Sequence, residues 1–233
     1  MIIYSEDYDG GLDQYGILIP IRDSKFRRTF AELRAHPVLG PLQSEWHLEH
    51  AGQSITREDI RRAHTQSYVD RLFSDSLEQE IIRTFELLDS KGNYHRYDPG
   101  RATRPLTKML ERAMYSIGGD YQCCQVALQK GFCYYFGGGA HHAQPDYGKG
   151  FCLLNDIVIV LRKAQAEGLI RTAWVIDVDA HKGDGTAAIT HGDDSIRTLS
   201  VHMARGWPLD EAEVDAAGKS NPSFIPSDVD IPI

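Results

Sequence analysis

Val175-Ile176-Asp177-Val178-Asp179-Ala180-His181-Lys182-Gly183-Asp184-Gly185 is the stretch that decides the fold. An apolar run, Thr172–Val178, leads directly into three ionisable side chains at alternate positions, Asp177, Asp179 and His181. In extended geometry these three would point to one side, because strand side chains alternate. Two carboxylates so close repel each other unless a cation or hydrogen bonds neutralise them. A carboxylate and an imidazole are suitable ligands for a divalent metal such as zinc, so one interpretation is a metal site. The alternative is a strand end whose acids and histidine are simply exposed to solvent.

The residues around this stretch alternate between strand and helix. The apolar run Thr172–Val178 predicts a strand that is buried on both faces of a parallel sheet. Asn155 or Asp156 is predicted to cap a helix that ends at Gly168. Alternating strands and helices imply an α/β fold with a mainly parallel sheet, whose ligands gather at the carboxyl ends of the strands. The other elements predicted here are strands at Cys133–Phe136 and Ile196–Val201, and a helix at Thr186–Thr190.

The preceding half of the chain is predicted to be mostly helical. Paired glycines, Gly118 and Gly119, lie inside a long helical segment and favour a close packing contact there. His64 is interpreted as a structural residue. The predicted elements are a strand at Ile2–Tyr4, helices through Phe26–Leu33 (capped by Asp23), Arg57–Phe73 and Leu106–Gln129, and a surface loop at Lys91–Arg104.

Length and composition are those of one sizeable domain with a real core. Of the 233 residues, 42% are hydrophobic and 25% are charged. The 25 basic and 33 acidic residues give a net charge of -8, which argues against nucleic-acid binding because such proteins normally carry a basic footprint.

Targeting and redox signals are few. The start has no basic region before an apolar stretch, and no apolar run approaches the roughly 18 residues of a membrane helix. We therefore predict a cytoplasmic chain with no membrane partner. Its four cysteines lack a C-x-x-C pair, which favours reduced thiols: Cys123, Cys124, Cys133 and Cys152.

A second motif, Gly137-Gly138-Gly139-Ala140-His141-His142, precedes the first. Adjacent histidines diverge in a regular strand, but a glycine-rich loop lets both rings enter one cavity. A histidine carries protons near neutral pH, and a carboxylate on its far nitrogen fixes its tautomer. Asp177 and Asp184 are the candidate carboxylates. A bare His-His pair is usually incidental, so the neighbouring motifs carry its significance.

In order, the motifs are G-G-A-H-H-A from Gly138, G-F-C-x-x-N-D from Gly150, D-V-D-A-H-x-G-D-G-T from Asp177 and T-L-S-V-H from Thr198. This set resembles the histone deacetylase and acetylpolyamine amidohydrolase superfamily over essentially the whole chain, with looser matches at Pro20-Ile21-Arg22 and 63–69. The resemblance implies a three-layer, arginase-like α/β fold with a mainly parallel sheet. It implies a single deacetylase-like domain over 1–233, roughly the amino-terminal two-thirds of the family domain with the C-terminal portion absent.

The activity implied is zinc-dependent hydrolysis of an N-acetyl or longer acyl amide on a lysine-like or polyamine amine. Asp179 and His181 match two zinc ligands, with Fe²⁺ as the alternative metal. His142 matches the general base and His141 the residue that places the water, with Asp184 and Asp177 as their carboxylate partners. Phe151 and Trp207 resemble the aromatic walls of an acyl-lysine tunnel or are ordinary core residues, and the Gly150 carbonyl is a candidate substrate contact. A K⁺ site in the family matches Asp177, Asp179, His181, Ser200 and Val201.

The sequence departs from the family in two places. Lys182 stands where the family more often has histidine or glutamine, and it either alters substrate preference or points into solvent. The family supplies a third zinc ligand, an aspartate, and a catalytic tyrosine beyond the equivalent of Val201, and no residue up to Ile233 lies in a matching motif. Several strands would also be missing, which leaves an exposed sheet edge.

Three hypotheses follow. The first is a deacetylase-family chain acting on an acetylated lysine peptide, an acetylpolyamine or a small acylated amine, with activity impaired in the chain as given. The second is a catalytically inactive scaffold or interaction protein. The third is an arginase-like ureohydrolase, which would need a manganese pair and fits the His-His pair less well. Assembly as a homo-oligomer is left open.

Overall fold

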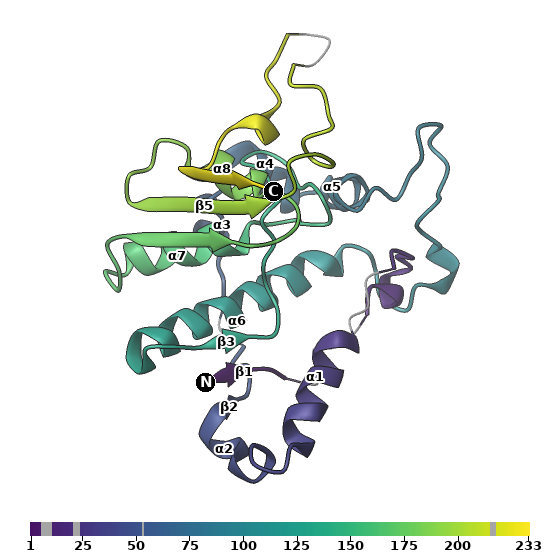
Figure 1. Ribbon diagram of the computed structural model, residues 1–233. Coiled ribbons are helices and arrows are strands. Elements are labelled where there is room, and N and C mark those ends of the chain that lie inside the picture. The colour runs from purple at the N-terminus through teal and green to yellow at the C-terminus, as the bar shows by residue number, and fades with distance from the viewer. Residues whose placement is uncertain (6–10, 21–23, 53, 215–217) are drawn as a thin grey trace. The chain divides into compact units, whose positions relative to one another are not determined.

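The computed structural model describes residues 1–5, 11–20, 24–52, 54–214 and 218–233 (Figure 1). They form two compact units, Met1–Ile55 with Ile81–Gly138, and Thr56–Glu80 with Gly139–Ile233. The expectation of one family-type domain over 1–233 stays a prediction. Among the helices of the described segments, none combines the length and the apolar character needed to cross a membrane.

The first unit contains a small parallel sheet. Strand β1 (Ile2–Ile3) pairs in parallel with β2 (His47–Leu48) on one side and with β3 (Tyr134–Tyr135) on the other. The helices of this unit are α1 (Ser24–Ala35), α2 (Gln43–Trp46) and α6 (Lys108–Lys130), while α5 (Leu77–Thr84) contains the boundary between the units. The predicted first strand and first helix are thus present, but Asp23, Ile21 and Arg22 lie outside the described residues.

Helix α6 confirms the long helix and the reason for its glycines. A side chain on Gly119 would overlap with the rings of Tyr135 and His50. His50 also stacks on Tyr115 of the same helix, with the ring centroids 3.9 Å apart. The glycine therefore admits a close approach of aromatic rings to the helix, as the sequence predicts.

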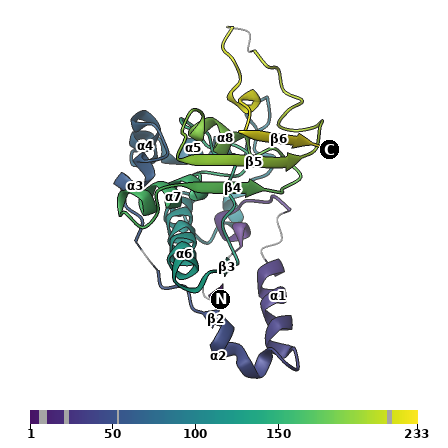
Figure 2. The same ribbon diagram turned by 60° about the vertical axis from the view of Figure 1, so that its left-hand side comes forward.

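The second unit holds the sheet that carries the motifs. Strand β5 (Ile196–His202) lies between β4 (Ala173–Asp177) and β6 (Val229–Pro232), and both pairings are parallel, as the arrows of Figure 2 show. The register places Asp177 opposite Ser200, and Ser200 opposite Asp230. The mainly parallel α/β prediction is confirmed. The helices are α3 (Arg57–Arg61), α4 (Gln66–Leu72), α7 (Asp156–Ala166) and α8 (Asp184–Thr190).

Helix α7 begins and ends where its sequence indicates. The Asn155 side chain accepts a hydrogen bond from the Val158 backbone N–H, which satisfies one of the free amides of the first turn. Val158 and Ile159 are fully buried. Gly168, just past the last turn, has φ 73°, so it ends the helix in the left-handed conformation that glycine adopts without strain.

The single helix predicted over Arg57–Phe73 is wrong, because the chain breaks between α3 and α4 at His64 and Thr65. The Thr65 hydroxyl accepts from the Tyr68 backbone N–H and starts a new helix. The Thr65 backbone N–H donates to the Pro145 carbonyl at 2.8 Å, outside any helix. Contacts with a distant loop therefore outweigh the continuous apolar pattern.

The prediction that the apolar run Thr172–Val178 is buried on both faces is also wrong. Val175 of β4 is buried, but Trp174, Ile176 and Val178 are 60%, 68% and 75% exposed. Side chains alternate along a strand, so Trp174 and Ile176 share the face opposite to Val175, while Val178 follows the end of the strand. An apolar run needs cover on both sides, and the described residues cover one. Within the described part of the chain β4 pairs only with β5, so the predicted open sheet edge is present.

Candidate active site

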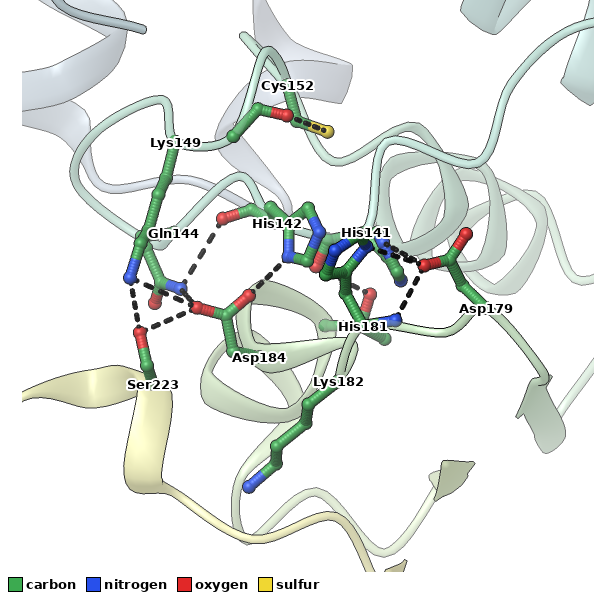
Figure 3. Close-up of polar contacts among 12 residues, drawn as sticks. His141, His142, Gln144, Lys149, Cys152, Asp179, His181, Lys182, Asp184 and Ser223 are labelled. Carbon is green, nitrogen blue, oxygen red and sulfur yellow. Dashed lines mark hydrogen bonds and ion pairs between the residues drawn. The ribbon is translucent and has the colours of Figure 1, made fainter. Parts of the chain in front are cut away.

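The paired histidines each bind one carboxylate, and both pairs lie in the second unit. Figure 3 shows the pair of His142 with Asp184. His141 Nδ1 lies 2.6 Å from Asp177 Oδ2, at the end of β4. His142 Nδ1 lies 2.7 Å from Asp184 Oδ1, at the start of α8. Both histidines are buried and their ring centroids are 3.9 Å apart, so the glycine-rich loop does bring the two rings together.

The loop that carries the histidines packs against the α8 start without room for a side chain. A Cβ on Gly185 would overlap with the Ala143 carbonyl and the backbone of His142. Asp184, the residue before this glycine, is fully buried. The close approach of the two backbones is therefore what places Asp184 within hydrogen-bond distance of His142.

The two histidines experience opposite electrostatic effects. Burial alone lowers the pKa of His141, but the hydrogen bond to Asp177 and the charges of nearby carboxylates outweigh it and raise this pKa. Burial likewise lowers the pKa of His142; the hydrogen bond to Asp184 opposes this effect but does not outweigh it, because repulsion from the neighbouring imidazoles adds to burial, so the pKa lies below the usual value. Burial opposes the ionised form of Asp184, but the contact with His142 prevails and lowers the Asp184 pKa. Adjacent groups whose pKa values move apart suit different roles in proton transfer.

The three alternating residues Asp177, Asp179 and His181 do not continue in extended geometry, so that part of the prediction is wrong. Strand β4 ends at Asp177, whose Oδ1 accepts from the Asp179 backbone N–H at 2.9 Å. Asp179 Oδ1 in turn accepts from the His181 backbone N–H at 2.8 Å. Such local side-chain bonds turn the chain, as aspartates commonly do. Asp177 is nearly buried, whereas the Asp179 and His181 side chains are 52% and 43% exposed.

Asp179 and His181 fit zinc in kind but not in number. Asp179 Oδ1 and His181 Nδ1 are 3.1 Å apart. Two ligands of one tetrahedral zinc, each about 2.0–2.1 Å from the ion, lie about 3.3 Å apart, so these donors are spaced as ligands of one ion. Zinc sites take three or four protein ligands. The described residues bring no group of three His, Cys, Asp or Glu side chains together in metal-binding geometry.

Among the residues that match the family's monovalent-cation site, Ser200 has a buried hydroxyl oxygen available for a ligand. Asp177 and Ser200 lie opposite each other on adjacent strands. Ser200 Oγ is buried and has no hydrogen-bond partner among the described residues. A buried hydroxyl without a partner is costly unless another group binds it. The chemistry fits an oxygen-coordinated cation held by the residues named in the motif, Asp177, Asp179, His181, Ser200 and Val201.

Of the proposed tunnel residues, Trp207 lies beside the histidines. Its ring centroid is 4.5 Å from that of His142 and 5.6 Å from that of His181. A side chain on Gly150 would overlap with the Trp207 ring, so this glycine lets the tryptophan approach. Phe151 is half-buried with φ 66°, a rare conformation for a non-glycine residue. The Gly150 carbonyl accepts from the Cys152 thiol at 3.5 Å.

Lys182 does not point into solvent, which corrects that alternative. The Lys182 side chain is 5% exposed, and its Nζ donates to the Ile225 carbonyl at 2.9 Å and lies 3.5 Å from Asp230 Oδ2. Figure 3 shows it extending away from the two histidines. His64 is buried between the Gln144 carbonyl and the Asn155 backbone N–H, as the structural interpretation predicts.

Three residues around Asp184 were not predicted: Gln144, Lys149 and Ser223. They form hydrogen bonds or close contacts with the carboxylate that holds His142 (Figure 3). Gln144 and Lys149 lie near the His-His motif in sequence, but no residue spacing predicts their contact with Asp184. Ser223 is 39 residues beyond Asp184, and no sequence pattern connects the two.

The fold and the site define a parallel α/β protein with paired His–Asp contacts at the carboxyl end of a strand, and the comparisons identify its relatives. The histone deacetylase domain matches residues 19–231. A probable deacetylase of Archaeoglobus fulgidus is 32% identical over 155 residues, covering 65% of this chain and 38% of that protein. Histone deacetylase 2 of Arabidopsis thaliana is 24% identical over 221 residues, covering 90% and 50%.

The chain belongs to the histone deacetylase family, a family of hydrolytic amidohydrolases. The crystal structure of the HDA15 HD domain has the same fold, with a TM-score of 0.64 at 19% identity, and the match covers 98% of this chain and 60% of that one. The predicted family and fold class are thus confirmed, which favours the deacetylase over the ureohydrolase hypothesis. The chain spans 38% and 50% of the two relatives above.

Proposed function

We propose that this chain carries the proton-transfer half of a site that hydrolyses acyl amides on lysine-like or polyamine amines. The observation that carries the proposal is the pair of buried His–Asp contacts, at 2.6 and 2.7 Å, beside Asp179 and His181. Two adjacent histidines with separate carboxylates can differ in pKa, so that one accepts a proton while the other stays protonated beside the same substrate.

His142 is the proposed general base. Its Nδ1 faces Asp184, so in the neutral ring Nδ1 carries the hydrogen and Nε2 keeps a lone pair. The lowered pKa of His142 keeps the ring neutral near pH 7, and a neutral ring can accept a proton from water. Asp184 fixes this tautomer and stabilises the cation formed after the proton arrives.

His141 has the complementary role. Its raised pKa keeps a larger share of the ring protonated at neutral pH. A positively charged imidazole 3.9 Å from the base, centroid to centroid, can orient a water and stabilise negative charge that develops on the acyl oxygen. Asp177 holds this ring through Nδ1, so Nε2 is the atom that can face the substrate.

Asp179 and His181 are the residues that would hold Zn²⁺, with Fe²⁺ as the alternative. When bound, such an ion polarises the acyl carbonyl and a water molecule. Because the described residues supply only two donors, we expect weak zinc binding and little turnover from this 233-residue chain. The Ser200 hydroxyl, which has no hydrogen-bond partner in the described part of the chain, supports K⁺ as a structural ion beside Asp177.

Trp207 and Phe151 are proposed as walls for the acyl-bearing chain of the substrate, and the Gly150 carbonyl as an acceptor for its amide N–H. An acetylated lysine peptide, an acetylpolyamine and a small acylated amine all present this group. From the sequence we also propose a cytoplasmic location, no nucleic-acid or membrane partner, and assembly as a homo-oligomer.

The test combines zinc binding with acetate release. Calorimetric titration with Zn²⁺ compares the wild type with Asp179→Asn/His181→Ala, and His95→Ala, an exposed histidine of the other unit, is the control. Acetate release is measured with an acetyl-lysine peptide and with N-acetylputrescine. We expect weak zinc binding that only the double variant abolishes. His142→Ala should reduce any residual acetate release by about 10²–10⁴-fold, the usual contribution of a general base.

Zinc binding that survives in the double variant would contradict the assignment of the ligands. Efficient deacetylation by the wild type would contradict the expected impairment. Residual acetate release that His142→Ala leaves unchanged would exclude this residue as the base and favour a non-catalytic role for the site.

A further inference from the structure

The carboxylate that holds His142 is itself held by other groups. Asp184 Oδ1 faces His142, and Asp184 Oδ2 accepts from the Ser223 hydroxyl at 2.6 Å and from Gln144 Nε2 at 2.9 Å. Asp184 is fully buried, and Ser223 and Gln144 are fully buried as well. A carboxylate with donors on both oxygens cannot rotate without losing one of these bonds, so its orientation toward His142 depends on them.

The direction of the Ser223 hydroxyl is set by Lys149. Lys149 Nζ lies 2.7 Å from Ser223 Oγ and 2.8 Å from Glu211 Oε2. An ammonium group can only donate, so Ser223 Oγ must accept from Lys149. The hydroxyl hydrogen is then free for Asp184, which as a carboxylate can only accept. The chain of donors therefore runs in one direction, from Lys149 through Ser223 to Asp184.

Lys149 also touches the aromatic residue beside the histidines. Its Nζ lies 5.4 Å from the centroid of the Trp207 ring, within the range of a cation–π contact. The Lys149 side chain is only 12% exposed, so its charge is shielded from most of the solvent. One ammonium thus contacts Trp207, Glu211 and Ser223, which belong to the segment after β5, while Lys149 itself follows the His-His motif.

We propose that Lys149 and Ser223 are positioning residues, which orient Asp184 and through it fix the His142 ring. Neither residue touches the atoms that would react. Lys149 acts through Ser223, and the 3.6 Å separation of Lys149 Nζ from Asp184 Oδ2 adds charge without a direct hydrogen bond. The catalytic consequence rests on the proposed function, but the hydrogen-bond relay can be measured in the full chain without turnover.

The experiment follows the ring N–H protons of the two histidines by NMR in chain labelled with ¹⁵N-histidine. The His142 Nδ1–H signal is assigned by its loss in His142→Gln, and the His141 signal, bound to Asp177, is the internal reference. The variants are Ser223→Ala, Lys149→Met, Lys149→Arg and the double variant Ser223→Ala/Lys149→Met. Lys130→Met, at the exposed end of α6, is the matched control.

In Ser223→Ala we expect the His142 ring proton to exchange with solvent about tenfold faster, as follows from the loss of one hydrogen bond to a charged group. The His141 proton should keep its wild-type rate. Lys149→Met should act in the same direction, Lys149→Arg should restore the rate, and Lys149→Met should add nothing in the Ser223→Ala background. That non-additivity distinguishes a relay from two independent contacts.

An unchanged His142 exchange rate in Ser223→Ala overturns the proposal. Equal acceleration of His141 and His142 also overturns it, because that result reflects general loosening of the fold. If Ser223→Ala does not fold, Lys149→Met decides the question alone: a His142 rate equal to that of Lys130→Met refutes the relay. Zinc binding and acetate release can fail while this relay holds, and the reverse is also true, so the two proposals are separable.

Discussion

Acidification from about pH 7 to about pH 4 should destabilise the second unit through His64. This ring is 3% exposed, and each of its nitrogens has a partner that fixes the hydrogen. Nε2 accepts from the Asn155 backbone N–H at 3.0 Å, so Nδ1 carries the hydrogen and donates to the Gln144 carbonyl at 2.9 Å. A second proton would have to sit on Nε2, opposite another donor. Burial accordingly lowers the pKa of His64 from 6.5 to about 4.

The sign and size of the effect follow from linkage. Above pH 6.5 neither the folded nor the unfolded chain protonates this ring, and the free energy of unfolding is unaffected by it. Between 6.5 and about 4 only the unfolded chain takes up the proton, so stability falls as the pH falls. At 1.36 kcal/mol per pH unit the loss reaches about 3 kcal/mol, and below that interval it stays constant.

Urea denaturation at a series of pH values, followed by tryptophan fluorescence, measures this loss. Other groups also titrate, so the quantity of interest is the difference between the wild type and His64→Gln, whose amide cannot take up a proton in this range. His95→Gln, at an exposed histidine, is the control. The difference between wild type and His64→Gln should change by about 3 kcal/mol across the interval. A pH-independent difference, or one that grows in favour of the wild type on acidification, would refute the reasoning.

Three further predictions concern packing, the open sheet face and a thiol. Gly185→Ala should lower the free energy of unfolding by about 1–3 kcal/mol, because the new methyl group overlaps with the His142–Ala143 backbone; an unchanged urea midpoint would contradict this. Ile176→Lys, on the exposed face of β4, should change stability by less than about 0.5 kcal/mol and reduce self-association measured by light scattering. Val175→Lys, on the buried face, should prevent folding. Equal effects of the two substitutions would contradict the difference between the faces. Burial raises the pKa of Cys152 to about 12, so iodoacetamide at about pH 8 should label it far more slowly in native chain than in urea, as mass spectrometry of the peptides would show.

Elements whose signals are local could be predicted from the sequence. Helix α7 has its capping asparagine, its buried apolar positions and its terminal glycine within fourteen residues of one another, from Asn155 to Gly168. Helix α6 and strand β5 follow equally simple periodic patterns. The His–Asp pairs were predicted through the family motifs, since His141 and Asp177 are 36 residues apart and no periodicity connects them.

Features that depend on distant contacts were missed. The break between α3 and α4 comes from bonds between His64 or Thr65 and residues about eighty positions later, against a continuous helical pattern. The apolar sequence of β4 is the same whether one face of the strand or both faces are covered, so the exposed face could not be predicted from it. Ser223 is a common residue in a loop, and only the folded chain brings it to Asp184. Lys182 is unusual for the family motif, but the burial of its ammonium depends on the distant residues Ile225 and Asp230.

The absence of space at Gly185 has a consequence for how this protein can change over generations. A Cβ at Gly185 would overlap with the backbone of His142–Ala143, so any side chain at this position requires one of the two segments to shift. A side chain at position 185 therefore costs stability unless the segment some forty residues earlier has also changed to make room for it. The two motifs are far apart in the sequence, but a change in one limits the changes that the other can accept.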